Sequence, residues 1–328
     1  MQGDREGIMR TVAISGCTGA IGIALINKCI EKNTKVIAYV RPGSKRRDNI
    51  PKHDLVKISD YDIKEFAKMS RLSGMVKLPE TDAFYHFAWA GTIGDGRNDT
   101  KLQADNIQYT LDAVKLAKSM KAKVFIGAGS QAEYGRVEGI LKPDTPVRPE
   151  NGYGAAKLCA GQLSRIMCSQ LEIKHVWARI LSVYGPYDGD KTMIISVINK
   201  LLDGERPALT GGMQTWDYLY SGDAADALYR IGEKSIEKPY SDADREGRVY
   251  CLGSGQAYPL KNYVKILRDM IDPKLELGFG EIPYPDKQVM NLCADISGLT
   301  EDTGFVPRTS FQKGISRTID YVKGLRDL

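Results

Sequence analysis

The sequence predicts an α/β fold: a doubly wound parallel sheet with a smaller mixed α/β lobe toward the C-terminus. Across residues 11–181, short apolar runs alternate with segments of helical spacing. Strands that alternate with helices form a parallel sheet covered on both faces. Beyond this region the alternation loosens into short strands, turns and helices. The chain has 328 residues, which is long enough for two such parts.

The composition excludes several classes of protein. Hydrophobic residues make up 42% and charged residues 27%, as in ordinary globular domains. No apolar run approaches the roughly 18 residues of a membrane span, and the polar residues 1–10 predict a flexible tail rather than a signal peptide. The net charge of +5 is dispersed except at Lys45-Arg46-Arg47, which fits a small anionic ligand better than nucleic acid. The six cysteines and three histidines have no metal-ligand spacing, so we expect reduced thiols, no metal and a cytoplasmic protein.

The first strand, at residues 11–15, runs directly into a glycine-rich turn and then a helix. This context is the one in which such a turn binds a dinucleotide in a Rossmann-type fold. Gly16 allows the tight turn, Gly19 lets the backbone approach a pyrophosphate, and Gly22 lets the helix pack closely. Amides at the helix N-terminus then face the phosphate charge. The spacing is G-x-x-G-x-x-G, and the predicted contacts are Gly16, Thr18, Gly19, Ala20, Ile21 and Gly22.

The residues after the second strand, at 35–40, indicate the form of the cofactor. NAD-binding chains carry an Asp or Glu here for the ribose 2′-hydroxyl, whereas this chain has Arg41, then Ser44 and the basic run. A guanidinium pairs with the 2′-phosphate that a carboxylate would repel. We therefore predict NADP(H), with contacts from Arg41 and Ser44. NAD(H) is the alternative if the basic loop is only solvated.

The third and fourth strands, at 55–59 and 83–88, end at further candidate contacts. The third strand ends at Asp60-Tyr-Asp62, and this end could hold an adenine amino group through a carboxylate or could cap the helix that starts near Ile63. Small residues after the fourth strand let the chain pass close to a cofactor. His86, inside that strand, is expected to be a packed core residue. The predicted cofactor contacts from these strands and the helix at 99–120 are Asp60, Tyr61, Phe87, Ala88, Ala90 and Asn106.

The reacting groups are expected after the fifth strand, at 123–126. Ser130 lies just beyond its carboxyl end, where open parallel sheets bind ligands. Tyr153 and Lys157 are four positions apart and share one face of the helix predicted at 153–171. A phenol titrates near pH 10, and an ammonium one turn away favours the phenolate. We therefore predict Ser130, Tyr153 and Lys157 as catalytic residues, the last two also touching the cofactor.

The rest of the chain completes the sheet and forms the lobe. A sixth strand is expected at 174–181 and another at 248–252, with a short strand at 207–210. Helices are expected at 193–202, 224–231, 260–271 and 311–325. The resulting boundaries are a tail at 1–10, a dinucleotide-binding domain at 11–185 with a returning segment at about 216–252, and a substrate-binding lobe at 186–215 and 253–328.

The glycine turn, Ser130, Tyr153 and Lys157 together resemble the extended short-chain dehydrogenase/reductase family, whose NAD(P)-dependent epimerase/dehydratase group acts on nucleotide sugars. The resemblance covers most of the chain, from about residue 10 to 325. Supporting motifs are His86-Phe-Ala88, Asn106, Ser130 to Gly135, Arg179 to Pro186, and Asp217 to Asp223.

The resemblance implies a role for each of these groups. Tyr153 would be the general acid/base, Lys157 would orient the ribose and lower the pKa of the tyrosine, and Ser130 would hold the substrate oxygen. The nicotinamide would carry the hydride, and Asn106 would brace the cofactor side. The family also implies a homodimer through a four-helix bundle of the helices at 99–120 and 153–171.

The chain departs from the family pattern at two positions. Ser182 stands where an Asn commonly contacts substrate phosphates, and Trp216 stands where an Arg usually grips a diphosphate. An indole cannot pair with a phosphate charge, so other groups hold the diphosphate or the substrate differs. Trp216 could instead stack on a base or sugar, or serve only in packing. The predicted substrate contacts are Trp89, Thr92, Gln131, Ser182, Tyr187 and Trp216.

The run from Gly129 to Ala132 lacks the Thr-Asp-Glu that dehydratases of this family carry, and Glu133 is expected to face away or to solvate the loop. A 4,6-dehydratase is therefore disfavoured. The basic cluster favours a reductase that consumes NADPH, acting on a 4-keto nucleotide-diphospho-sugar of the 4-keto-6-deoxyhexose type. The alternative is a nucleotide-sugar 4-epimerase with tightly bound NAD. A regulator without turnover is disfavoured because it would usually lose the Tyr–Lys pair.

Overall fold

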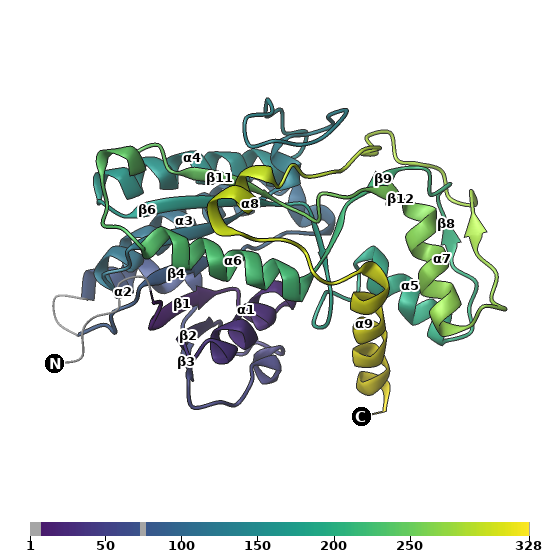
Figure 1. Cartoon of the computed structure of the whole chain (residues 1–328), viewed down its shortest axis with the longest axis horizontal. Helices are drawn as coiled ribbons and strands as arrows, with labels where there is room; N and C mark the ends of the chain where they lie inside the picture. The colour runs from purple at the N-terminus through teal and green to yellow at the C-terminus, as the bar shows by residue number, and fades with distance from the viewer. Residues whose placement is uncertain (1–7, 73–76, 328) are drawn as a thin grey trace.

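The computed structural model describes residues 8–72 and 77–327, and its centre is a seven-stranded parallel sheet (Figure 1). The order β3-β2-β1-β4-β5-β6 is that of the doubly wound dinucleotide-binding fold, and β11 adds a seventh strand beside β6. The predicted fold class is thus confirmed. The strands are β1 (Thr11–Ser15), β2 (Lys35–Val40), β3 (Val56–Asp60), β4 (Ala83–His86), β5 (Val124–Ser130), β6 (Lys174–Ile180) and β11 (Arg248–Leu252).

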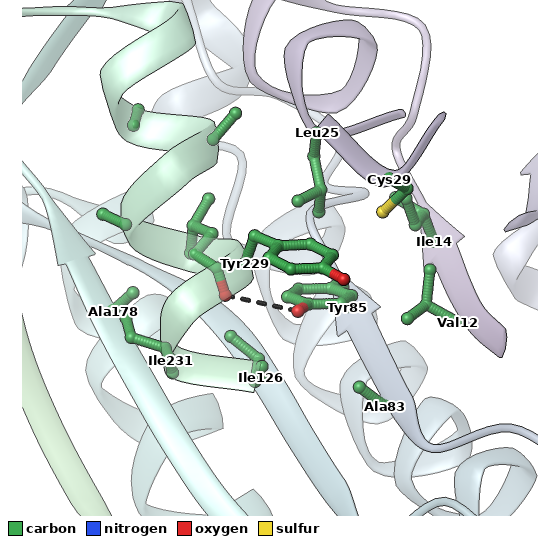
Figure 2. Close-up of a cluster of buried hydrophobic side chains, with 14 of the residues drawn as sticks. Val12, Ile14, Leu25, Cys29, Ala83, Tyr85, Ile126, Ala178, Tyr229 and Ile231 are labelled. Atoms are coloured by element: carbon green, nitrogen blue, oxygen red, sulfur yellow. Dashed lines mark hydrogen bonds between the residues drawn. The ribbon is translucent and has the colours of Figure 1, made fainter. Parts of the chain in front are cut away.

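Helices cover both faces of this sheet. One face carries α1 (Ala20–Glu31) and α6 (Ser221–Ile236), and the other carries α2 (Phe66–Leu72), α3 (Thr100–Ser119) and α4 (Gly152–Gln170). Side chains alternate across β4 as a strand requires. Tyr85 faces α1 and α6 (Figure 2), and Phe84 joins the opposite core, where its ring stacks on Phe125 at 5.9 Å.

Polar groups buried in the core between the sheet and helices α1 and α6 form hydrogen bonds. The hydroxyl of Tyr85 donates a hydrogen bond to the carbonyl oxygen of Leu228 at 3.2 Å, the dashed line in Figure 2. Thr34 donates to the carbonyl of Met9 at 3.0 Å. Met9 is only 1% exposed, so the predicted tail ends before this residue and not at residue 10. Residues 1–7 of that predicted tail lie outside the described residues.

A smaller lobe stands beside the carboxyl edge of the sheet, at the right of Figure 1. Its apolar core joins α5, α7 and α9, with Ile198, Leu267 and Ile319 almost fully buried. Its helices are α5 (Met193–Leu202), α7 (Leu260–Ile271) and α9 (Phe311–Arg326). The structure also has three separate pairs of short strands: β7 (Ser182–Tyr184) with β10 (Tyr218–Tyr220), β9 (Thr215–Trp216) with β12 (Tyr258–Pro259), and β8 (Ala208–Leu209) with β13 (Gly278–Phe279).

The last part of the chain returns once more to the sheet domain. Helix α8 (Ser297–Thr303) packs against α6 and β11, and Leu299 and Phe305 are buried in the core beneath α6. The sequence boundaries assigned this segment to the lobe, because a helix without a strong apolar stripe gives no local signal of its partner. Within residues 8–72 and 77–327, no helix combines the length and apolar character needed to cross a membrane.

Candidate active site

The candidate cofactor contacts lie along one edge of the sheet. Because the strands are parallel, their carboxyl ends meet at that edge. Ser15 at the end of β1 pairs with His86 at the end of β4, and Val40 at the end of β2 pairs with Asp60 at the end of β3. The turns after these four strands therefore face a common crevice, which is where open α/β sheets bind ligands.

The glycine turn after β1 has the shape that the dinucleotide pattern requires. Gly16 adopts a φ of +73°, and a Cβ there would overlap the backbone of Ala88. A Cβ on Gly22 would lie 2.5 Å from the Cα of Cys17. A Cβ on Gly19 would meet only the guanidinium of Arg46, at 3.9 Å. Gly19 is the N-cap of α1 and makes no side-chain cap, and the first turn of α1 carries no acidic residue. The amides of Ala20 and Ile21 thus begin a helix suited to a pyrophosphate.

The basic loop after β2 places a different arginine near this turn from the one that the sequence singled out. The guanidinium of Arg46 lies nearest to Gly19, 3.9 Å from the position of a Cβ there. It also donates a hydrogen bond to the carbonyl of Asp188 at 3.3 Å. Arg41 is exposed, and its carbonyl accepts the amide of Ser44 at 3.1 Å. Arg46 is therefore the better candidate for a 2′-phosphate.

The acidic end of β3, at Asp60-Tyr-Asp62, supplies the predicted cap for the turn that starts at Ile63. Asp60 itself forms an ion pair with Arg47. The cap of the 3-10 turn at Ile63–Glu65 is Asp62, which accepts the amide of Lys64 at 3.1 Å. An adenine contact from Asp60 or from the exposed Tyr61 stays a prediction.

The loop after β4 is held by two buried amides of α3. Asn106, 1% exposed, accepts the amide of Ala90 and donates to the carbonyl of Ala90, both at 3.0 Å. Gln103, 2% exposed, donates to the carbonyls of Gly91 at 2.9 Å and Gly96 at 2.7 Å. Asn106 thus braces the loop that carries the predicted contacts Phe87, Ala88 and Ala90. Gln103 braces the same loop and was not among the predicted residues.

His86 is a core residue, as expected. Its Nδ1 lies 2.8 Å from the hydroxyl of Ser15 and its Nε2 lies 3.4 Å from that of Thr110. Burial, with the charge of Lys157, lowers the pKa of His86 to about 3. A ring that is neutral and bonded on both nitrogens is no candidate for a catalytic base.

The three predicted catalytic residues come together. Ser130 is the last residue of β5, which continues beyond the predicted strand, and its hydroxyl hydrogen-bonds the phenol of Tyr153 near the start of α4. Lys157 is one turn further along α4 and only 3% exposed. Its Nζ donates to the carbonyl of Ala128 at 2.7 Å and lies 3.8 Å above the indole of Trp89.

The electrostatics of this group differ from the expectation. Burial raises the pKa of Tyr153, against opposing effects of the Ser130 hydrogen bond and the charge of Arg97. Burial lowers the pKa of Lys157 to about 7, with Glu133 opposing. Lys157 is not among the groups that shift this pKa here, and its expected lowering of the tyrosine pKa stays a prediction. The ammonium points to Ala128 and Trp89, 5.9 Å from the centre of the tyrosine ring.

Lys157 should accordingly reduce stability at neutral pH. The folded pKa is about 7 and the ordinary value is 10.5, so between these values the unfolded chain holds a proton that the folded chain lacks. The contribution of Lys157 to stability rises with pH through this window and is least favourable below pH 7. Lys157→Met should raise the melting temperature by a few degrees at pH 7 and less at pH 10.

Thermal unfolding of both proteins at the two pH values measures this effect. Lys101→Met is the control, because the Lys101 side chain is 83% exposed. If Lys157→Met changed the melting temperature equally at both pH values, the titration of Lys157 would be ruled out as the cause.

Glu133 corrects a second expectation. It is fully buried, and its carboxylate accepts the amide of Ser130 at 2.8 Å, the indole of Trp177 at 2.9 Å and the Nε of Arg179 at 2.8 Å. It neither faces away from the site nor solvates the loop. It fixes the backbone of the predicted catalytic residue Ser130, and no local sequence pattern indicates this because two of its partners, Trp177 and Arg179, lie on β6.

A cleft of about 470 Å³ opens beside the reacting groups. Gln131, Arg97 and Asn151 line it from the sheet domain, and Trp216 and Lys287 line it from the lobe. Glu150, also in its wall, is paired with Arg136 at 2.9 Å. The cleft therefore carries unpaired positive charge, which suits an anionic substrate.

Of the predicted substrate contacts, Gln131 and Trp216 line this cleft, and Trp89, Thr92 and Ser182 lie against residues at or beside it. The indole of Trp216 donates to the hydroxyl of Ser182 at 2.7 Å, so the two positions that depart from the family pattern form one uncharged pair. Trp89 lies edge-on to Tyr153 at 6.1 Å, and the carbonyl of Thr92 accepts from Arg97 at 2.8 Å. Tyr187 does not line the cleft. Its backbone φ is +66°, and its ring packs on that of Tyr321 in α9 with the ring centres 4.6 Å apart.

All six cysteines are free thiols. The described residues contain no group of three or more His, Cys, Asp or Glu side chains placed to hold a metal ion.

The strand order, the glycine turn and the Ser–Tyr–Lys group define a nicotinamide-dependent protein of the extended short-chain dehydrogenase/reductase class. More particularly, the chain belongs to the NAD dependent epimerase/dehydratase family, whose family model matches residues 12–253.

Three similar proteins illustrate the range of this family. A putative UDP-glucose 4-epimerase of Methanocaldococcus jannaschii is 24% identical over 95% of this chain and 98% of its own length. A dTDP-4-dehydro-6-deoxyglucose reductase of Escherichia coli is 20% identical, covering 95% and 97%. The crystal structure of a UDP-glucuronic acid 4-epimerase from Bacillus cereus in complex with NAD has a TM-score of 0.80 at 21% identity, covering 96% of this chain and 99% of that chain.

Proposed function

We propose that this protein is an NADPH-dependent reductase of a 4-keto nucleotide-diphospho-sugar, of the 4-keto-6-deoxyhexose type. The observation that carries the proposal is the arginine-rich loop after β2, where Arg46 lies beside the glycine turn and no acid precedes Asp48. A 2′-phosphate fits this loop better than a free 2′-hydroxyl, and NADPH is the usual reagent of net reductions. The similarity to a dTDP-4-dehydro-6-deoxyglucose reductase supports the substrate class.

The residues of the site fit such a reduction. A bound nicotinamide supplies the hydride for the ketone carbon. Tyr153 gives the proton of its hydroxyl to the ketone oxygen, and Ser130 donates a hydrogen bond to the same oxygen. The turn from Gly16 to Gly22 holds the pyrophosphate, and Lys157 orients the nicotinamide ribose. Glu133 is bonded to Ser130, Trp177 and Arg179, so it is not free to remove a proton as the carboxylates of a dehydratase do.

A nucleotide-sugar 4-epimerase is the second candidate. It is favoured by similarity to a putative UDP-glucose 4-epimerase and to a UDP-glucuronic acid 4-epimerase that binds NAD. An epimerase oxidises and then reduces the same carbon, so it consumes no cofactor.

One assay separates the two. The protein is mixed with NADPH and 4-keto-6-deoxy sugars carried on UDP, dTDP, CDP or GDP, and the absorbance of NADPH is followed at ~340 nm. The proposal expects one NADPH oxidised for each ketone reduced. Interconversion of 4-epimers without net loss of absorbance, with NAD retained by the purified protein, would establish the epimerase instead.

The proposed preference for NADPH over NADH can be tested by replacing Arg46. Arg46→Ala should weaken NADPH binding by about 10- to 100-fold, the value of one charge-assisted contact to phosphate, and should leave NADH binding unchanged. Arg47→Ala is the matched control because Arg47 is paired with Asp60. Fluorescence titration of both cofactors measures the affinities. Tighter binding of NADH than NADPH, or an equal loss of both in Arg46→Ala, would contradict the 2′-phosphate contact.

The homodimer that the family resemblance implies remains part of this proposal. Leu163 and Ile166 on the outer side of α4 are 40% and 45% exposed, and Ala155, about two turns earlier, is exposed as well. An exposed apolar stripe on a helix suits a helix–helix interface. The molar mass in solution, measured by light scattering, tests it.

A further inference from the structure

We propose that Arg97 is a positioning residue of the reaction centre: its guanidinium, fixed against the ring of Tyr153, stabilises the phenolate that remains when the tyrosine gives up its proton. The inference rests on the proposed reduction and assigns to Arg97 the electrostatic role that sequence analysis gave to Lys157. It adds to the Ser–Tyr–Lys group a cation from a different element, the 3-10 turn at Gly94–Arg97.

The contact is one between a cation and an aromatic face. The Cζ of Arg97 lies 4.4 Å from the centroid of the Tyr153 ring. A ring attracts a cation through the negative charge of its π face, and loss of the hydroxyl proton adds a full negative charge to that ring. The attraction is therefore stronger after proton transfer than before it. Only an interaction of this kind, stronger in the transition state than in the ground state, accelerates a reaction.

One hydrogen bond holds the guanidinium of Arg97, and two more hold the residues on either side of it. Arg97 donates from Nη1 to the carbonyl of Thr92 at 2.8 Å. Just before it, the carbonyl of Gly96 accepts from the buried Gln103 at 2.7 Å. Just after it, the side chain of Asn98 accepts the amide of Gly152 at 3.0 Å, next to Tyr153 at the start of α4. The arginine and the tyrosine are thus tied to the same helix end before any substrate arrives.

The other ionisable side chains around Tyr153, those of Glu133 and Lys157, are bonded to other groups. Glu133 is paired with Arg179 at 2.8 Å. Lys157 is bonded to Ala128, and burial lowers its pKa to about 7, so a large part of it is uncharged at neutral pH. No carboxylate of residues 8–72 and 77–327 forms an ion pair with Arg97. Its charge also lowers the pKa of Tyr153 against the effect of burial.

The chemical step balances without any further group. The O–H bond of Tyr153 breaks, its proton goes to the ketone oxygen, and its electron pair stays on the tyrosine as phenolate. The ketone carbon takes the hydride. Arg97 stabilises the phenolate until water returns a proton to it.

The test is the pH dependence of turnover for Arg97→Met and Arg97→Lys. A general acid must be protonated, so activity falls above the pKa of Tyr153. Arg97→Met should lower kcat roughly 3- to 30-fold, the range of a cation–π contact, and should move the alkaline limb of the profile to higher pH. Arg97→Lys should restore part of both. Lys287→Met, which removes the other cation of the cleft, should leave the alkaline limb in place.

Two outcomes would overturn the inference. One is a rise in KM for the nucleotide sugar with kcat and the alkaline limb unchanged, which would make Arg97 a substrate anchor. The other comes from a measurement that needs no turnover, the alkaline titration of phenolate absorbance. The difference between each protein and its Tyr153→Phe counterpart isolates this one tyrosine. An identical midpoint with and without Arg97 would refute the role, even if the protein reduces no nucleotide sugar at all.

Discussion

Tyr153→Phe should lower kcat by about 10²- to 10⁴-fold, the usual value of a positioned acid or base. The variant removes only the hydroxyl that bonds Ser130 and would protonate the ketone. The ring remains, so its contacts with Trp89 at 6.1 Å and Arg97 at 4.4 Å are kept. The loss should therefore fall on kcat, with little change in cofactor affinity or melting temperature.

The measurement is steady-state turnover with NADPH and the best ketone from the nucleotide panel, together with a cofactor titration. Tyr258→Phe is the matched control, because its ring is 49% exposed and its hydroxyl bonds only Gln256 at 3.1 Å among the described residues. Any turnover that survives unchanged in Tyr153→Phe would mean that another group protonates the substrate.

Local sequence patterns were sufficient for much of the fold. The strands at 35–40 and 248–252 and the helices at 193–202 and 260–271 have the predicted bounds, because each is a compact apolar run or an amphipathic stripe between clear breaks. The glycine turn could be predicted because strand, turn and helix are neighbours in sequence. Ser130 and Tyr153 could be predicted because both lie at element ends along one edge of a parallel sheet.

Contacts between distant segments could not be predicted in this way. Glu133 meets Arg179 across 46 positions, and the pairing of Ser182 with Trp216 spans 34. Neither segment carries a local sign of its partner. The spacing of Tyr153 and Lys157 fixes their shared helix face but not the direction of the ammonium, which the carbonyl of Ala128 and the indole of Trp89 decide.

Glu133→Gln should lower the free energy of unfolding by about 3–5 kcal/mol, the cost of leaving one member of a buried ion pair without its partner. The side chains of Glu133 and Arg179 are 0% and 5% exposed, so water cannot replace the lost charge. The amide oxygen of Gln can still accept from Ser130 and Trp177, which keeps the fold. Chemical denaturation followed by circular dichroism measures the change. Glu150→Gln, at the exposed pair with Arg136, is the control and should change stability far less.

A double variant separates the structural role of Glu133 from its role in activity. Replacing both members of a buried pair with uncharged groups is often close to neutral, so Glu133→Gln with Arg179→Met should recover most of the lost stability. Activity should return only in part, because the neutral amide oxygen of Gln accepts from the Ser130 amide more weakly than the carboxylate does. Full recovery of both would show that Glu133 serves only the fold. Loss of stability in the double variant as large as in the single one would show that the uncompensated charge of Arg179 is not the cause.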